Sequence, residues 1–187
     1  EASFRETGGG VTFSGGEPLM QAEFVLRLLE GCRALGIHTA VDTCGAASAD
    51  AIARTAELAD LILYEVKHLD EESHRRLTGS SNREILDNLR RLARLGAPVR
   101  VRFPLLPGIN DDEGHVRRLA SFLSSLRLPE VDVVPYRRVA PEAYEALGRR
   151  YAGAETQEPG PAAVDATVGL LSACGLEARV AHRASPR

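Results

Sequence analysis

The sequence predicts an α/β fold with a parallel sheet, and two observations carry that prediction. Short segments rich in valine, isoleucine and leucine alternate along the chain with longer segments in which apolar residues recur every three or four positions. Polar residues and glycines follow most of the short segments, which is where parallel α/β folds place their sites. Strands separated by helical segments of this length pair in parallel, with the helices outside the sheet.

The short segments are predicted as strands. The segment Leu61–Val66 is strongly apolar, and we expect Val99–Pro104 to end at Pro104 and Pro107. In chain order the predicted strands are Val11–Phe13, His38–Asp42, Leu61–Val66, Val99–Pro104, Val131–Pro135 and Glu177–Val180.

The longer segments are predicted as helices. The first carries an apolar stripe of Phe24, Leu28, Cys32 and Leu35, with Val25 and Leu29 alongside, and Gly36 is expected to stop it. In chain order the predicted helices are Gln21–Leu35, Ala49–Ala59, a short helix from Asp70 to Leu77, Arg83–Leu95, Asp111–Leu126 and Pro161–Cys174.

Capping residues support the bounds of these helices. Ser48 and Asp70 provide oxygen acceptors for the free N–H groups of a first turn. Gly96 and Gly175 are suited to end a helix, because glycine adopts the left-handed conformation there without strain. Pro161 suits a first helical position, where its missing N–H costs nothing.

Composition narrows the class of protein. A chain of 187 residues, 44% hydrophobic, can bury one core, so residues 1–187 are expected to form a single domain. The net charge of −3 gives no electrostatic case for nucleic acid, and no apolar run approaches the ~18–20 residues that span a membrane. Cys32, Cys44 and Cys174 lie far apart, which suits a cytoplasmic location and supports no metal-binding motif.

The segment Gly8–Pro18, GGGVTFSGGEP, has the most informative pattern in the chain. Gly15 and Gly16 let the main chain approach a ligand where any Cβ would collide. Glu17 adds a carboxylate, and Pro18 biases it toward an extended conformation. The pattern is neither a P-loop nor G-x-G-x-x-G. It predicts a site that holds a small polar molecule at a strand end, or alternatively a glycine-rich turn between strand and helix.

Lys67 is the only lysine among 23 lysine and arginine residues. Lysine presents a compact charge, whereas arginine presents a wide planar fork. The single lysine therefore indicates a position where arginine cannot replace it; alternatively, it is a lysine retained by chance at a solvated edge. An unpaired charge at the end of such an apolar strand would be costly. Glu65 lies two residues earlier on the same face of the strand, which predicts an ion pair.

Five predicted strand ends bring polar groups to one rim of the sheet. Arg102, within the fourth strand, is expected either to face the interior near a substrate or to form a structural ion pair. The polar segments at the rim are Ser14–Glu17, Asp42–Gly45, Glu65–Lys67, Pro107–Gly108 and Pro135–Arg137.

The motifs resemble, in order and spacing, the activating enzymes of glycyl-radical enzymes, a branch of the radical S-adenosylmethionine (SAM) proteins. The resemblance implies a partial (β/α)6 TIM-like barrel, of which this chain would supply all but the first strand and its cluster loop. The family's C-x3-C-x2-C cluster motif is absent, so the chain is expected to be the C-terminal portion of a longer protein. The resembling segments are GGGVTFSGGEPLMQAEF, IHTAVDTCG, LADLILYEVKHLD, HRRLTGSSN, VRFPLLPGIND and VVPYRRV.

The resemblance also implies a SAM site. In the resembling proteins, the positions of Gly15, Gly16 and Glu17 hold the amino group of SAM. The positions of Asp42 and Thr43 lie near its carboxylate, in some members around a monovalent cation. These assignments suit a zwitterionic amino acid, which needs acceptors at its ammonium end and a cation at its carboxylate end.

Three further positions complete the implied site. The strand-end lysine of the family, here Lys67, helps to hold the carboxylate and ribose side of SAM. Glu65 stands where the family usually has aspartate, and its extra methylene could displace a bound cation. Arg137 stands where the family usually has histidine, which removes a neutral ring near the nucleoside.

The resemblance implies a radical SAM activase in the full-length parent, with a [4Fe–4S] cluster held by residues outside this chain. Its partners would be a glycyl-radical enzyme and a reductant such as flavodoxin or ferredoxin, and the chain alone would be inert. Two alternatives stay open. One is a non-catalytic remnant that binds SAM or docks on a partner. The other is an aldolase-like barrel with Lys67 as the Schiff-base nucleophile, against which the neighbouring Glu65 argues.

Overall fold

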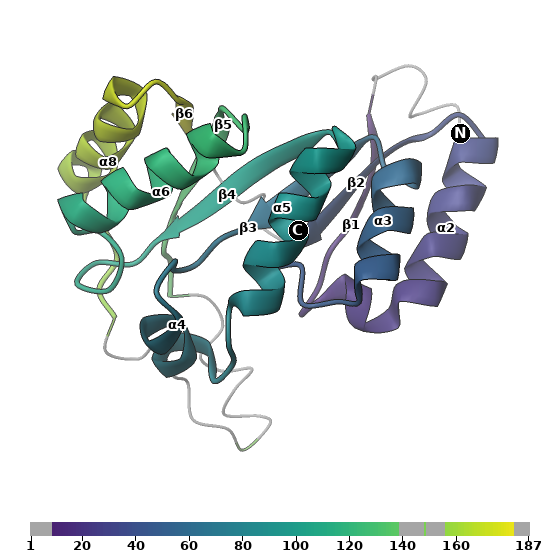
Figure 1. Ribbon diagram of the computed structural model, residues 1–187, viewed down its shortest axis with the longest axis horizontal. Helices are drawn as coiled ribbons and strands as arrows, with labels where there is room; N and C mark the ends of the chain where they lie inside the picture. The colour runs from purple at the N-terminus through teal and green to yellow at the C-terminus, as the bar shows by residue number, and fades with distance from the viewer. Residues whose placement is uncertain (1–8, 139–147, 149–155, 182–187) are drawn as a thin grey trace.

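The computed structural model describes residues 9–138, 148 and 156–181, which form one six-stranded sheet with helices packed on one of its faces (Figure 1). The strands follow one another across the sheet in chain order, and every neighbouring pair is parallel. The predicted α/β class is therefore confirmed. The sheet is open, with β1 and β6 at its edges, as a partial barrel requires.

All six predicted strands are present. Each of the first five differs from its expected bounds by one residue; β4 continues through Pro104 to Leu105 instead of ending at the proline. Pro104 is tolerated because its carbonyl, not its missing N–H, is the group that is hydrogen-bonded there. The strands are β1 (Gly10–Phe13), β2 (His38–Thr43), β3 (Leu61–Glu65), β4 (Val99–Leu105), β5 (Glu130–Pro135) and β6 (Glu177–Val180).

The predicted helices are also present, with small changes at their ends. The first is preceded by a short 3-10 turn, η1 (Pro18–Gln21). The helices are α2 (Ala22–Ala34), α3 (Ala49–Leu58), α4 (Glu71–Thr78), α5 (Arg83–Leu95), α6 (Glu113–Ser125) and α8 (Pro161–Ala173).

Side-chain caps begin several of these helices as predicted. The Ser48 hydroxyl accepts a hydrogen bond from the N–H of Ala51 at 3.2 Å, and the Asp70 carboxylate accepts one from Ser73 at 2.8 Å. Gly96 ends α5 in the left-handed conformation, with φ of 65°. Local sequence thus sets where these helices begin and end.

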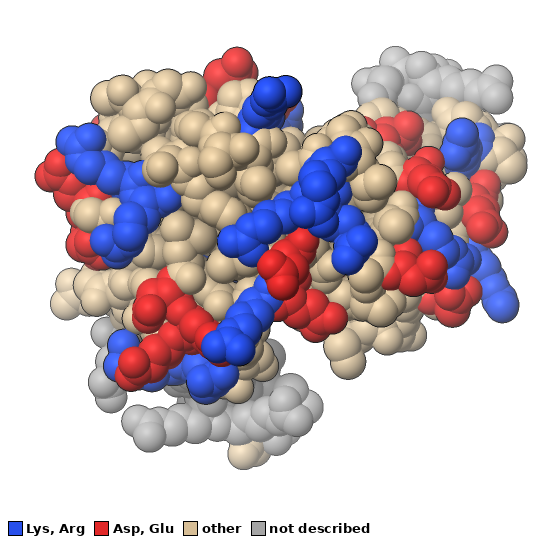
Figure 2. Space-filling view, viewed as in Figure 1, with Lys and Arg blue, Asp and Glu red and all other residues tan. Residues whose placement is uncertain are grey.

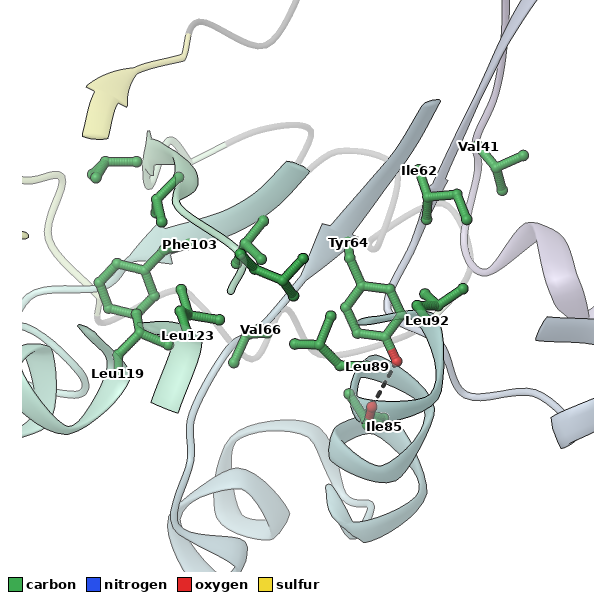
Figure 3. Packing of buried hydrophobic residues seen from close by; sticks show 14 of the residues in the cluster. Val41, Ile62, Tyr64, Val66, Ile85, Leu89, Leu92, Phe103, Leu119 and Leu123 are labelled. Carbon is green, nitrogen blue, oxygen red and sulfur yellow. Dashed lines mark hydrogen bonds between the residues drawn. The ribbon is translucent and has the colours of Figure 1, made fainter. Parts of the chain in front are cut away.

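Alternate residues of the strands form the core between sheet and helices. Val41, Ile62 and Phe103 are at most 1% exposed and point toward the helices. Tyr64 is fully buried, and its hydroxyl donates a 2.6 Å hydrogen bond to the main-chain oxygen of Ile85 in α5 (Figure 3). The residues that alternate with them, such as Leu63 and Glu65 in β3, point to the opposite face of the sheet, which is called the helix-free face below.

The apolar stripe predicted for the first helix does not form its buried face. Phe24, Leu28 and Leu35 are 60%, 38% and 50% exposed, whereas Val25 and Leu29 are buried. Both sets have helical spacing, so the pattern predicted the helix correctly but not which apolar side packs on the sheet. α2 lies beside the edge strand β1, where no further helix among the described residues covers its outer side (Figure 1).

Candidate functional site

Because all strands are parallel, the loops that follow them gather at one edge of the sheet, the lower edge in Figure 1. Gly15 and Gly16 lie there just after β1, and both are exposed. Gly15 has φ of 147°, which disfavours other residues. A Cβ added to either glycine would meet no atom within 4 Å, so open space lies in front of this main chain.

The Glu17 carboxylate joins the end of β1 to the end of β2. Its Oε1 accepts hydrogen bonds from the Thr43 hydroxyl at 2.6 Å and from the N–H of Leu19 at 3.0 Å. Its Oε2 accepts one from the N–H of Cys44 at 2.8 Å. The extended conformation expected before Pro18 is present, with φ of −136° and ψ of 110°. Glu17 therefore caps η1 and braces two neighbouring strand ends at once.

Asp42 and Thr43 point to opposite faces of β2. Thr43 is 2% exposed, and besides donating to Glu17 its hydroxyl accepts from the N–H of Gly45 at 2.9 Å. Asp42 lies on the helix-free face, where its carboxylate is 2.6 Å from the guanidinium of Arg102 on β4. The ion pair expected for Arg102 is therefore present, and it lies on the helix-free face of the sheet.

Lys67 and Glu65 form the ion pair that their spacing predicted. Lys67 Nζ lies 2.5 Å from Glu65 Oε1, and the side chains are 31% and 12% exposed. The lysine is thus partly open to solvent, while its partner is largely covered. This ion pair engages the amino group that Schiff-base chemistry would have to use.

Further ion pairs lie along the helix-free face and on the helices. On the helix-free face, Arg179 Nε is 2.8 Å from the largely buried Asp132, and Arg100 is 2.6 Å from Glu130. On the helix-covered side, Figure 2 shows basic and acidic side chains intermixed. The predicted site residue Arg137 lies just beyond β5 and is exposed.

Gly45 is held against the core by Tyr64. A Cβ on Gly45 would lie 1.7 Å from the Tyr64 hydroxyl, and the residue has φ of 75°. Burial raises the pKa of Tyr64, so its hydroxyl stays protonated and donates to α5. Burial and a hydrogen bond to Glu17 raise the pKa of the neighbouring Cys44 thiol to about 11, which makes it a poor metal ligand or nucleophile at neutral pH.

Sequence reasoning missed three buried asparagines that hold the strand-end loops. Asn88 donates to the carbonyls of Gly45 and Ala47, at 2.9 and 2.8 Å. Asn82 donates to the carbonyls of His68 and Leu69 in the loop after β3, and Asn110 donates to those of Lys67 in the same loop and of Pro104 in β4. The signal for Asn88 was present, since it is a polar residue within the apolar face of α5. Each amide donates to two main-chain carbonyls at or near the strand ends.

A pair of histidines packs behind the Lys67 segment. The rings of His68 and His115 stack with centroids 4.1 Å apart. His115 is fully buried, neither ring nitrogen has a hydrogen-bond partner among the described residues, and burial lowers its pKa to about 4. His115 is therefore a neutral core residue.

Neither a metal cluster nor a membrane span is found in the part of the chain that the structure describes. No three histidine, cysteine, aspartate or glutamate side chains gather there as a metal site would require. Cys32 lies in α2, Cys44 follows β2 and Cys174 follows α8, so the cysteines do not fit an iron–sulfur cluster. Within the same residues, no helix has the length and apolar character needed to cross a bilayer.

Comparison with known proteins identifies relatives across most of the chain. Residues 1–120 match the radical SAM superfamily. The chain is 37% identical over 180 residues to the trans-4-hydroxy-L-proline dehydratase activating enzyme of Clostridioides difficile, covering 95% of this chain and 60% of that protein. It is 35% identical over 170 residues to the pyruvate formate-lyase-activating enzyme of Staphylococcus aureus, covering 87% of this chain and 68% of that one.

A solved structure agrees with these sequence relatives. The crystal structure of a domain of pyruvate-formate lyase-activating enzyme from Bacteroides vulgatus superposes with a TM-score of 0.77 and 32% identity. The match covers 92% of this chain and 99% of that domain. The architecture described above is thus shared with a relative of known structure.

Proposed function

Because this chain belongs to the radical SAM superfamily, in the branch that activates glycyl-radical enzymes, we propose that the carboxyl edge of its sheet binds the amino-acid moiety of SAM. Proteins of this superfamily use SAM together with a [4Fe–4S] cluster. The amino-acid moiety carries an ammonium and a carboxylate, so its site must offer hydrogen-bond acceptors and a cation.

One observation carries the proposal: an open glycine main chain and the only lysine lie at the same edge of the sheet. Gly15 and Gly16 follow β1 and face open space, and Lys67 follows β3. With β2 between them, two strand spacings separate these segments, about 10 Å. The long lysine side chain can reach into that interval, so the glycine main chain would bind the ammonium and Lys67 the carboxylate.

Glu17 and Thr43 have a different part in this proposal. Their side chains already share a hydrogen bond, and the Glu17 carboxylate accepts two more from main-chain N–H groups. We assign them to bracing: they hold the glycine segment against β2, so that its main chain keeps one conformation when the ligand binds. Asp42, Glu65 and Arg137 line or border the same edge.

The activity of a complete protein is proposed at a second level. This chain spans 60% of the length of the Clostridioides relative, and its cysteines do not fit a cluster. We propose that the complete protein is an activase that takes a hydrogen atom from a glycine of a partner enzyme, with an electron donor such as flavodoxin or ferredoxin. When bound, SAM and the cluster supply the radical chemistry; the residues here bind and orient SAM.

SAM binding can be tested on this chain by titration calorimetry. We expect SAM to bind, and 5′-methylthioadenosine, which lacks the amino-acid moiety, to bind at least tenfold more weakly. Lys67→Arg should weaken SAM about tenfold, because the guanidinium is too wide for a site built around an ammonium. Arg76→Met, at an exposed ion pair on α4, is the matched control and should bind as the parent does.

Two outcomes would reject the proposal. Equal affinity for SAM and methylthioadenosine would show that the amino-acid moiety is not bound at this site, and unchanged SAM affinity in Lys67→Arg would show that Lys67 does not contact SAM.

Trapping of a carbonyl substrate on Lys67 by borohydride would favour the Schiff-base alternative. Anaerobic reconstitution with iron and sulfide should leave this chain without a cluster-type EPR signal.

A further inference from the structure

We propose that Asn110 is a positioning residue for Lys67. Its side-chain amide holds the main chain of Lys67 in place, and so determines the position from which the lysine ammonium reaches a ligand. The inference rests on the proposed SAM site, because it assigns a ligand-binding role to Lys67. It concerns a residue after β4 that acts on a residue after β3, 43 positions away in sequence.

Asn110 is completely buried and uses its whole side chain. Its Nδ2 donates to the carbonyl of Lys67 at 2.9 Å and to the carbonyl of Pro104 at 2.7 Å. Its Oδ1 accepts from the N–H of Leu106 at 2.8 Å. Both amide protons and the amide oxygen are thus engaged, and no other uncharged side chain of this size offers two donors and an acceptor in one plane.

Lys67 depends on this contact because the sheet ends before it. The N–H of Val66, one residue beyond the end of β3, still donates to the carbonyl of Arg102 in β4 at 2.9 Å. Lys67 is the first residue beyond that bond. Its carbonyl then receives the Asn110 amide, which ties the lysine to the end of β4 in place of strand pairing.

The residues that follow Lys67 are held in the same way. Asn82 donates to the carbonyls of His68 and Leu69, at 2.9 and 2.8 Å. Three consecutive carbonyls are therefore bound by two buried asparagines, 0% and 2% exposed. His68 is 6% exposed, so its carbonyl needs a protein partner in any case, whereas Lys67 and Leu69 are more open, and in a turn that only linked β3 to α4 water would satisfy their carbonyls. Preorganisation of the lysine explains the arrangement, because a ligand then need not order the main chain on binding.

The test exploits the single lysine of the chain. Acetylation with an N-hydroxysuccinimide ester, followed by peptide mass spectrometry, reports the reactivity of Lys67 separately from the N-terminal amine. Asn110→Asp keeps the size of the side chain and its acceptor for Leu106, but replaces both donors with an oxygen that repels the carbonyls of Lys67 and Pro104. Asn88→Asp is the matched control: it removes an equally buried two-carbonyl clamp, but from the loop after β2.

We expect Lys67 to be acetylated about fivefold faster in Asn110→Asp than in the parent chain, and we expect the variant to bind SAM about tenfold more weakly. Asn88→Asp should leave the acetylation rate of Lys67 unchanged, even where its unfolding midpoint falls by a similar amount. This difference separates a positioning role from a general loss of stability. If Asn110→Asp does not fold, Asn110→Ser provides a milder removal of the same two hydrogen bonds.

Other outcomes would overturn the inference. A folded Asn110 variant with the parent's acetylation rate and SAM affinity would show that Lys67 does not depend on Asn110. In the unmodified chain, side-chain amide protons of Asn110 that exchange as fast as exposed ones would contradict the hydrogen bonds themselves. A parent chain in which SAM leaves Lys67 acetylation unchanged would instead reject the SAM site, while faster acetylation in Asn110→Asp would still support the effect of Asn110 on Lys67.

Discussion

Arg102 of β4 reaches across β3 to form an ion pair with Asp42 of β2, with 2.6 Å between guanidinium and carboxylate. The two residues are 60 positions apart, and their side chains are 9% and 20% exposed. The pair therefore ties three strands together on the helix-free face, beside the edge where the proposed site lies.

Removing one partner of this pair should be costly. We expect Arg102→Met to lower the free energy of unfolding by about 3 kcal/mol, because the largely covered Asp42 carboxylate loses its guanidinium. Arg102→Met combined with Asp42→Asn should recover most of that loss. Arg100→Met, which breaks a more exposed pair with Glu130, is the control and should cost less than about 1 kcal/mol. Urea denaturation measures all of these, and equal losses for Arg102→Met and Arg100→Met would contradict the argument.

Gly45 should tolerate no side chain. Gly45→Ala places a Cβ within 1.7 Å of the Tyr64 hydroxyl in a left-handed conformation, so we expect a loss of at least about 3 kcal/mol. Gly79→Ala is the control: its φ of 80° carries the same conformational strain, but no atom lies within 4 Å, so it should cost about 1–2 kcal/mol. If thermal unfolding ranks the two variants in the opposite order, the Tyr64 side chain must shift at little cost to make room for the Cβ.

Stability should fall in mild acid because of His115. Its folded pKa of about 4 lies below the ordinary value of about 6.5, so between these values the unfolded chain binds a proton that the folded chain does not. This contribution to stability is complete above about pH 6.5 and is lost progressively toward pH 4, by about 3 kcal/mol in total. His115→Phe preserves a ring against His68 and should flatten the profile of unfolding free energy over that range. An unchanged slope in the variant would assign the acid sensitivity to other groups.

The outer side of α2 and the open edge of β1 should promote self-association of this chain. Met20, Phe24, Leu28 and Leu35 expose an apolar stripe, and β1 pairs with β2 alone among the described strands. We expect sedimentation to show association that grows with concentration. Phe24→Glu should reduce it, whereas Leu95→Glu, at an exposed leucine on α5, should not. A strictly monomeric chain with slowly exchanging amides at Val11–Phe13 would show that the edge is closed in some other way.

Strands, helices and most helix ends were predictable from the sequence because they depend on neighbours along the chain. Apolar patterns marked the strands and most of the helices, whereas α4 and α8 were marked by Asp70 and Pro161 at their starts. Ser48, Asp70 and Gly96 act through bonds to residues at most four positions away. The Glu65–Lys67 pair was equally accessible, since residues two apart on a strand share a face. The parallel pairing of the strands then followed from the helices between them.

Tertiary structure alone decided which groups from distant segments meet. The Glu17–Thr43 brace and the Asn110–Lys67 contact join residues 26 and 43 positions apart, and no local pattern determines such a distance. The same holds for which apolar side of α2 packs on the sheet, since the stripes that contain Val25 and Phe24 both have helical spacing, yet only Val25 is buried. Hydrophobic spacing determines local conformation, but which polar atoms come within hydrogen-bonding distance depends on how the completed elements pack.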